Sequence, residues 1–205
     1  GFEKTNTDTI RFGRRSGKPV WQMAQWASRY DLGGTPPVRQ ADGSVAYANE
    51  GKRIVRSADG TLTLDITTST EYRSPRTADG AWPHLLIQQD FTHRPNIGRI
   101  RHLYFAMDLR IEHCERRMSD EQYDESLHTA QSPFYFFMRN TNPRSPDYGL
   151  SLWVGVPSFD YRYERLSDEE YVQWDIGTAT YIYAIPPRSI WGDVSFHDRE
   201  WTCCR

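Results

Sequence analysis

Three successive stretches between residues 61 and 112 alternate apolar and polar side chains, and this pattern constrains the fold more than any other feature of the chain. The stretches cover residues 61–69, 84–91 and 102–112. Since successive side chains of a strand point to opposite sides, the pattern predicts three β-strands, each with one face in a core and one in water. The apolar positions are Leu62, Leu64 and Ile66, then Leu85, Ile87 and Phe91, then Leu103, Phe105, Met107, Leu109 and Ile111.

Ala-Asp-Gly occurs three times, at residues 41–43, 58–60 and 78–80. Asp-Gly supplies the positive φ angles that tight hairpin turns require. The second triplet separates a strand-like segment at 52–56 from the first alternating stretch, and the third triplet separates the first stretch from the second. We therefore expect two successive hairpins, with the three alternating stretches as neighbours in one sheet.

Further segments at 134–140, 150–156 and 178–185 have the composition or alternation of strands. One short helix is expected at 119–130, where Ser119 and Gln122 have the spacing of a capping box. About ten strands with short turns predict an all-β protein, an antiparallel β-sandwich of two sheets. We expect a single domain over residues 1–205, with residues 1–18 as a partly ordered arm.

The composition excludes several classes of protein. An aromatic content of 14% excludes a disordered chain and favours strands. The formal net charge of -2 predicts no nucleic-acid partner, and no apolar run is long enough to span a bilayer. The three cysteines lack a C-x-x-C spacing, so no zinc site is expected, and a bridge between Cys203 and Cys204 would be strained. A first residue other than Met fits a trimmed N-terminus and leaves the compartment open; for a protein that acts on or binds polysaccharide, we expect a secreted or periplasmic location.

Charged residues on the polar sides of the alternating stretches are candidates for binding or catalysis. Glu71, Arg73 and Arg76 place a carboxylate between guanidinium groups, which suits an acidic sugar and equally suits a surface ion pair. His84 is either a general base, because the pKa of histidine lies near neutrality, or a hydrogen-bonded structural residue. The polar side of the same stretch also carries Gln88 and Asp90.

Asp108, Arg110 and Glu112 share one side of the third stretch. Four residues of a strand span about 13 Å, which exceeds the carboxyl separations of about 5 to 9.5 Å that glycosidases use. A carboxylate on a neighbouring strand, Glu71 or Asp90, would suit catalysis with Asp108 better. The alternative is a solvated charged face. The candidate catalytic residues are Glu71, His84 and Asp108.

Aromatic residues at polar positions of strands are candidates for stacking on sugar rings, whose C–H patches pack on flat aromatic faces. Aromatic residues are also common in cores, so both interpretations stand. The loop with Asn140, Asn142 and Asp147 is a candidate site for a structural calcium ion, since calcium prefers oxygen ligands; no other cofactor is expected. The aromatic candidates are Tyr104, Tyr135, Trp153, Tyr181 and Tyr183.

The order of strands and the aromatic polar face resemble the concanavalin A-like jelly roll of lectins, glucanases and polysaccharide lyases. A local likeness concerns alginate-type lyases, which carry R-[TS]-E-L-R on one strand and Q-[IV]-H on another. Here residues 69–73 match that motif at Thr70, Glu71 and Arg73, whereas Ser69 replaces its first arginine. Residues 88–90 keep Gln88 and have Asp90 in place of the histidine. The resemblance implies a protein that acts on or binds carbohydrate.

Three functions follow as hypotheses. The first is a polysaccharide hydrolase or lyase that works in a cleft on the concave sheet. The second is a non-catalytic, lectin-like module that binds polysaccharide or oligosaccharide through the same face, and the third is a structural or interaction domain. A converging pair of carboxylates, or a Tyr or His beside an Arg, would favour the enzyme, and exposed aromatic rings without such a pair would favour the module. The expected substrate-binding residues are Arg73, Arg76, Gln88, Asp90, Tyr104, Arg110, Trp153 and Tyr181.

Overall fold

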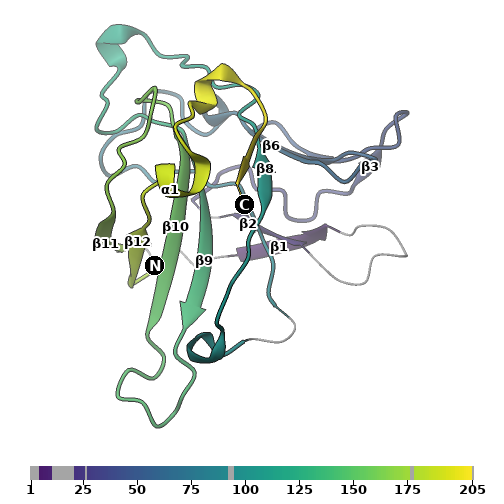
Figure 1. Cartoon of the computed structure of the whole chain (residues 1–205). Coiled ribbons are helices and arrows are strands. Elements are labelled where there is room, and N and C mark those ends of the chain that lie inside the picture. Colours follow the sequence, from purple (N-terminus) through teal and green to yellow (C-terminus); the bar gives the residue numbers. More distant parts are fainter. Residues whose placement is uncertain (1–4, 11–20, 26, 92–94, 176–177, 205) are drawn as a thin grey trace. The chain divides into compact units, whose positions relative to one another are not determined.

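The computed structural model describes residues 5–10, 21–25, 27–91, 95–175 and 178–204 (Figure 1). The chain is mostly β, with 33% of residues in strands and 9% helical, and several of its sheets are antiparallel. Contacts between Cα atoms divide the chain into two compact units, Gly1–Pro95 and Asn96–Arg205, called unit 1 and unit 2 below. Each unit is described by itself, and the single-domain expectation stays a prediction.

Unit 1 contains two antiparallel sheets. The first has the order β1-β2-β7 and the second the order β3-β4-β5-β6. A core cluster of Met23, Leu32, Tyr47 and Ile54 draws its residues from both sheets and from the loop after β2. The strands are β1 (Thr5–Ile10), β2 (Trp21–Gln25), β3 (Val38–Arg39), β4 (Val45–Ala48), β5 (Lys52–Arg56), β6 (Leu62–Ile66) and β7 (Leu86–Gln88).

The first predicted hairpin is confirmed. β5 pairs antiparallel with β6, with Arg56 opposite Leu62. The turn between them uses the expected chemistry, because Gly60 has a φ of 96° and the Asp59 carboxylate accepts a hydrogen bond from the amide of Thr61 at 2.9 Å. A local turn signal was therefore sufficient to predict this pair of strands.

The second predicted hairpin is wrong, because β7 pairs with β2 instead of β6. After β6 the chain enters a 3₁₀ turn, η1 (Thr68–Thr70), and an irregular segment. The turn at 78–80 closes on that segment: Gly80 donates to the carbonyl of Thr77 at 2.9 Å, and Arg76 Nη1 donates to the carbonyl of Gly80 at 2.7 Å. These short-range bonds satisfy the loop internally, so the Asp-Gly turn does not bring two strands together.

Unit 2 contains a four-stranded sheet of order β11-β12-β10-β9 and a two-stranded sheet of β8 and β13. The pair β10–β12 is parallel, so this sheet departs from the wholly antiparallel arrangement expected. Val156, Phe159, Trp191, Phe196 and Cys204 form its core cluster. The elements are η2 (Ile97–Arg99), β8 (Met107–Leu109), η3 (Asp120–Gln122), β9 (Gln131–Arg139), β10 (Ser151–Asp160), β11 (Tyr171–Asp175), β12 (Thr180–Ala184), α1 (Arg188–Trp191), η4 (Phe196–Asp198) and β13 (Thr202–Cys204).

The helix expected at 119–130 is a single 3₁₀ turn, η3. The side chain of Gln122 does accept a hydrogen bond from the amide of Ser119, at 3.2 Å, as a capping box requires. The chain leaves the helical conformation at Tyr123, and the Asp124 carboxylate then accepts from the amide of Ser126 at 2.9 Å. An Asp side chain that bonds to nearby amides offers the backbone an alternative to a helix, which explains why η3 stops.

The apolar residues of the three alternating stretches were expected in a core, and none of them is fully buried. Leu64 is 39% exposed, because β6 is an edge strand of its sheet, and Leu103 lies outside the strands and is exposed. Phe105 is half-buried and stacks on Phe134 with ring centroids 4.3 Å apart. Ile66, Leu85, Ile87, Met107 and Leu109 are half-buried, and so are Leu152 and Val154 of the strand expected at 150–156.

The three cysteines form no disulfide bond with one another. Cys114, Cys203 and Cys204 are free thiols. Cys203 is exposed and Cys204 is buried, because neighbours on a strand point to opposite sides. Burial raises the pKa of the Cys204 thiol, so this side chain acts as a small apolar group of the core.

Candidate functional site

The sequence predicted that the candidate site residues share one face of one sheet. The structure contradicts this prediction. Gln88 lies on β7 and Asp108 on β8, which belong to different sheets, while Glu71 and His84 lie outside the strands. The expectation failed because it required β6, β7 and β8 to be neighbours. The catalytic roles of Glu71, His84 and Asp108 stay predictions.

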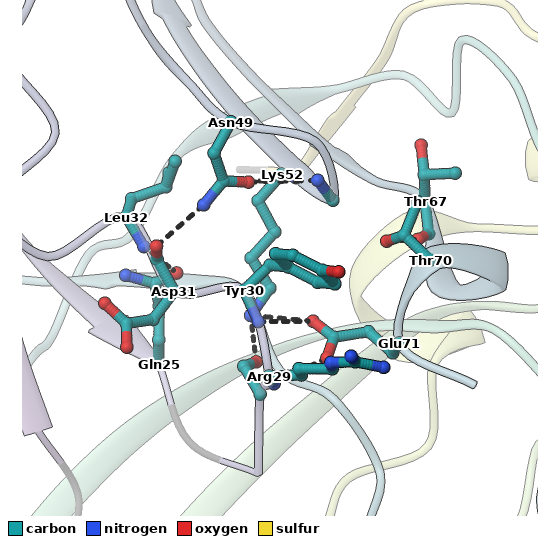
Figure 2. Close-up of polar contacts among 12 residues, drawn as sticks. Gln25, Arg29, Tyr30, Asp31, Leu32, Asn49, Lys52, Thr67, Thr70 and Glu71 are labelled. Carbon is teal, nitrogen blue, oxygen red and sulfur yellow. Dashed lines mark hydrogen bonds and ion pairs between the residues drawn. The ribbon is translucent and has the colours of Figure 1, made fainter. Parts of the chain in front are cut away.

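Glu71 is the centre of a buried polar cluster in unit 1 (Figure 2). Its carboxylate accepts hydrogen bonds from the amide of Arg29 at 2.5 Å and from the amide of Tyr30 at 3.4 Å. Lys52 Nζ lies 3.8 Å from Glu71 Oε1, and the two side chains are 0% and 2% exposed. Lys52 also donates to the hydroxyl of Ser28. Glu71 is thus bound by donors of its own unit.

This cluster holds the loop between β2 and β3. The amide of Leu32 donates to the side chain of Gln25 at 3.0 Å, and Asn49 Nδ2 donates to the carbonyl of Asp31 at 2.7 Å (Figure 2). Burial lowers the pKa of Lys52, and the charges of Glu71 and Asp31 partly oppose that shift. The buried ion pair of Lys52 and Glu71 therefore anchors this loop.

Two further candidates in unit 1, Arg76 and Gln88, contact neighbouring residues of that unit. Arg76 packs its guanidinium over the ring of Trp82 at 4.8 Å, in addition to its bond to Gly80. Gln88 Nε2 donates to Gln22 Oε1 at 3.0 Å across the β2–β7 pair. Arg73 and Asp90 are exposed.

The candidates on and beside β8 in unit 2 are exposed or make surface contacts. Asp108 is exposed and lies opposite Cys203. Arg110 forms an ion pair with Glu112 at 3.2 Å and lies 4.9 Å from the ring of Trp201. Tyr104 is exposed. Surface ion pairs of this kind contribute under about 1 kcal/mol to stability.

A different group of residues gathers on one side of the four-stranded sheet of unit 2. Trp153 on β10 lies opposite Phe137 on β9 and opposite Ile182 on β12, and Gln173 on β11 continues the row. The next row is Tyr135, Gly155, Ala184 and Tyr171. Residues opposite one another in a sheet share a side. We call Tyr135, Phe137, Trp153 and Tyr171, with the intervening positions of these two rows, the aromatic face.

Three rings of the aromatic face, Tyr135, Phe137 and Trp153, pack against one another. The Phe137 and Trp153 centroids are 4.7 Å apart, and Tyr135 meets Trp153 edge to face at 5.7 Å. Phe137 is 53% exposed and Tyr171 is 48% exposed. Gly155 makes room for the Tyr135 ring, because a Cβ at position 155 would lie 2.8 Å from that ring. The result is a broad aromatic surface with a glycine beneath it.

Sequence reasoning found part of this face and missed the rest. Trp153 and Tyr135 were candidates, whereas Phe137 and Tyr171 were not. The strand at 134–140 does alternate, with Tyr135, Phe137 and Arg139 on one side, and that signal would have identified Phe137.

Tyr181 and Tyr183 lie on the opposite side of the sheet, facing away from Trp153. Their partners on β10 are Leu152 and Val154, which share the side of the core residue Val156. Tyr183 donates its hydroxyl proton to Glu170 at 2.6 Å, and Tyr181 packs against Trp174 at 4.9 Å. Tyr181 therefore does not act together with Trp153 in a single binding surface.

Tyr135 should make stability depend on alkaline pH. Burial raises its pKa from 10.0 to about 12, and the nearby Tyr171 and Asp175 add to the shift. The unfolded chain then loses this proton first, so the free energy of unfolding should fall as the pH rises from about 10 to 12. Urea unfolding across this range should show a shallower decline for Tyr135→Phe than for the wild type. Equal slopes would contradict the raised pKa of Tyr135 in the folded chain.

A small hollow lies beside Asp160 in unit 2. It offers about 30 Å³ of space, far below the 300 Å³ or more of usual ligand pockets. Burial opposes ionisation of Asp160, yet hydrogen bonds from Arg162, Gln131 and Thr129 hold its pKa well below the usual range. The carboxylate is thus a structural anchor, and the hollow is too small for a sugar ring.

The loop between β9 and β10 was the candidate calcium site. The Asn140 side chain accepts from the amide of Asn142 at 3.0 Å, and the Asn142 side chain accepts from the amide of Arg144 at 3.1 Å. These oxygens therefore already serve turn hydrogen bonds, and calcium binding stays a prediction. Over the ranges that the structure describes, no three His, Cys, Asp or Glu residues are placed to hold a metal ion.

Comparison with protein families, with curated proteins and with solved structures finds no match for this chain. Among the described residues, no helix has the length and apolar character needed to cross a membrane.

Proposed function

We propose that the chain is a non-catalytic carbohydrate-binding module whose aromatic face stacks on sugar rings. The register of β9, β10, β12 and β11 carries this proposal, because it aligns Phe137 and Trp153 in one row and Tyr135 and Tyr171 in the next. An exposed group of aromatic rings is the main feature that a sugar-binding surface requires.

The surroundings of the rings suit a polar ligand. Gln173 is exposed in the same row as Trp153, and its amide can both donate to and accept from hydroxyl groups. Tyr171 presents a phenol at the edge of the sheet. Apolar stacking with polar groups at its border is the combination that distinguishes a sugar from a purely apolar partner.

The hydrolase or lyase hypothesis has less support than the binding module. Glu71, the first of its catalytic candidates, binds two backbone amides and lies beside Lys52 in a buried cluster. A carboxylate so occupied serves its own loop. The two-sheet jelly roll, the concanavalin A-like resemblance and a secreted location likewise remain predictions, which the binding module does not require.

The proposal predicts that Phe137→Ala weakens glycan binding about ten-fold, which corresponds to about 1.4 kcal/mol of lost stacking. A glycan array with the wild-type chain would first identify a ligand, and titration calorimetry would then measure its affinity. Tyr181→Ala is the matched control, since Tyr181 is equally exposed on the opposite side of the same sheet.

The two variants separate the outcomes. Loss with Phe137→Ala and full binding with Tyr181→Ala would support the aromatic face. An array with no bound glycan would contradict the proposal, and so would equal affinities of the wild type and Phe137→Ala.

A further inference from the structure

A polar row borders the aromatic face at one end. Arg139 on β9 lies opposite Ser151 on β10, and the Ser151 hydroxyl bonds to the Thr180 hydroxyl at 2.7 Å. Thr180 in turn lies opposite Asp175 on β11. One cation and one anion therefore stand at the two outer strands of this row, beside the row of Phe137 and Trp153.

Several arginines in the described part of unit 2 form no ion pair, and among them Arg139 lies on β9 beside the aromatic face. Its side chain is exposed, and it makes no ion pair with the described residues. A guanidinium left without a carboxylate on a binding surface is free to grip an anion with two parallel hydrogen bonds. The arginines of the unit that do form ion pairs are Arg110, Arg116, Arg117, Arg162, Arg165 and Arg188.

The position of Arg139 matches a charged sugar stacked on the face. Arg139 and Phe137 are two residues apart on β9 and point to the same side, so their Cα atoms are about 6.5 Å apart. A ring that stacks on Phe137 thus brings a substituent within reach of the guanidinium. Asp175, three strands and about 14 Å away, binds the amide of Thr178 at 2.9 Å and repels an anion at the far edge.

We infer that the ligand of the aromatic face is an acidic glycan, whose carboxylate or sulfate group binds Arg139. This inference rests on the proposed function and adds the chemical class of its ligand. The acidic group lies at the β9 edge, because the charge of Arg139 attracts it there and the charge of Asp175 excludes it from the β11 edge.

The test compares Arg139→Gln with Arg144→Gln by titration calorimetry. Arg144 is an exposed arginine of the adjacent loop and serves as the matched control. Three probes of equal length are used: a uronic acid oligosaccharide, its neutral parent and a sulfated form of the neutral parent. The wild type is expected to bind at least one acidic probe about ten-fold or more tightly than the neutral one. Arg139→Gln should remove that preference, whereas Arg144→Gln should keep it.

The outcomes separate this inference from the proposed function. Preference for the uronic acid assigns a carboxylate, and preference for the sulfated probe assigns a sulfate. Equal binding of all three probes by the wild type, with loss on Phe137→Ala, would overturn the role of Arg139 and leave the module in place. Binding of no probe, together with an empty glycan array, would contradict both. Added salt should weaken acidic binding more than neutral binding, and an equal salt response would also overturn the inference.

Discussion

Glu71→Ala is expected to lower the free energy of unfolding by about 3–5 kcal/mol, the range for breaking a buried ion pair on one side. Lys52 would keep a buried charge without its counter-ion, and the amides of Arg29 and Tyr30 would lose their acceptor. Urea unfolding measures the overall change. Amide hydrogen exchange at Tyr30 and Leu32 should rise first, because these residues belong to the loop that the cluster holds.

Two controls make this prediction sharp. Asp65→Ala removes an exposed carboxylate from β6 and should change stability by no more than about 0.5 kcal/mol. The double variant Lys52→Met/Glu71→Leu removes both charges and should recover much of the loss, since apolar pairs often replace buried ion pairs well. A stable Glu71→Ala variant with lost activity on a polysaccharide would instead restore the catalytic hypothesis for Glu71.

Trp191→Ala is expected to cost about 3–5 kcal/mol of stability, the usual range for truncation of a buried aromatic residue. Trp191 is buried in the core of unit 2, meets Phe196 edge to face at 5.2 Å, and donates its indole proton to the carbonyl of Pro157 at 2.9 Å. Trp191→Phe keeps a ring and loses the hydrogen bond, so a loss of about 1–2 kcal/mol is expected.

Trp174→Ala provides the comparison for this second prediction. Trp174 is exposed on β11, and its truncation should change the unfolding midpoint only slightly. Similar losses for Trp174→Ala and Trp191→Ala would mean that α1 does not close the core of unit 2.

The sequence was sufficient where structure is set by neighbouring residues. The strand alternation around 62–66 and the Asp59–Gly60 turn predicted the β5–β6 hairpin, because both signals act within a few residues. Alternation also predicted which residues of β10 share a side. In both cases the backbone geometry of a strand or turn decides which residues face the same side or lie opposite one another. That geometry depends on residues a few positions apart, so it can be predicted from the sequence.

Tertiary structure decided the choice of partners. Gln88 pairs with Gln22, 66 positions earlier, and Asp108 pairs with Cys203 near the end of the chain. When two strands are far apart in the sequence, their pairing depends on which apolar sides are buried against each other. Alternation within a strand does not identify its partner, because every candidate partner alternates in the same way. For this reason, the prediction of a site on three neighbouring strands was wrong.

The same distinction separates the two polar groups of this protein. Glu71 looked like a surface carboxylate, but the alternating strand ends at Ile66, and the 3₁₀ turn after it directs Glu71 toward Lys52 and the loop at 29–30. The positions of the aromatic face could be identified strand by strand, from the alternation of side chains within each strand. Only packing determined that the side of Val156 enters the core and leaves the side of Trp153 and Phe137 exposed, because either side of an apolar-rich strand can be buried until a second layer covers one of them.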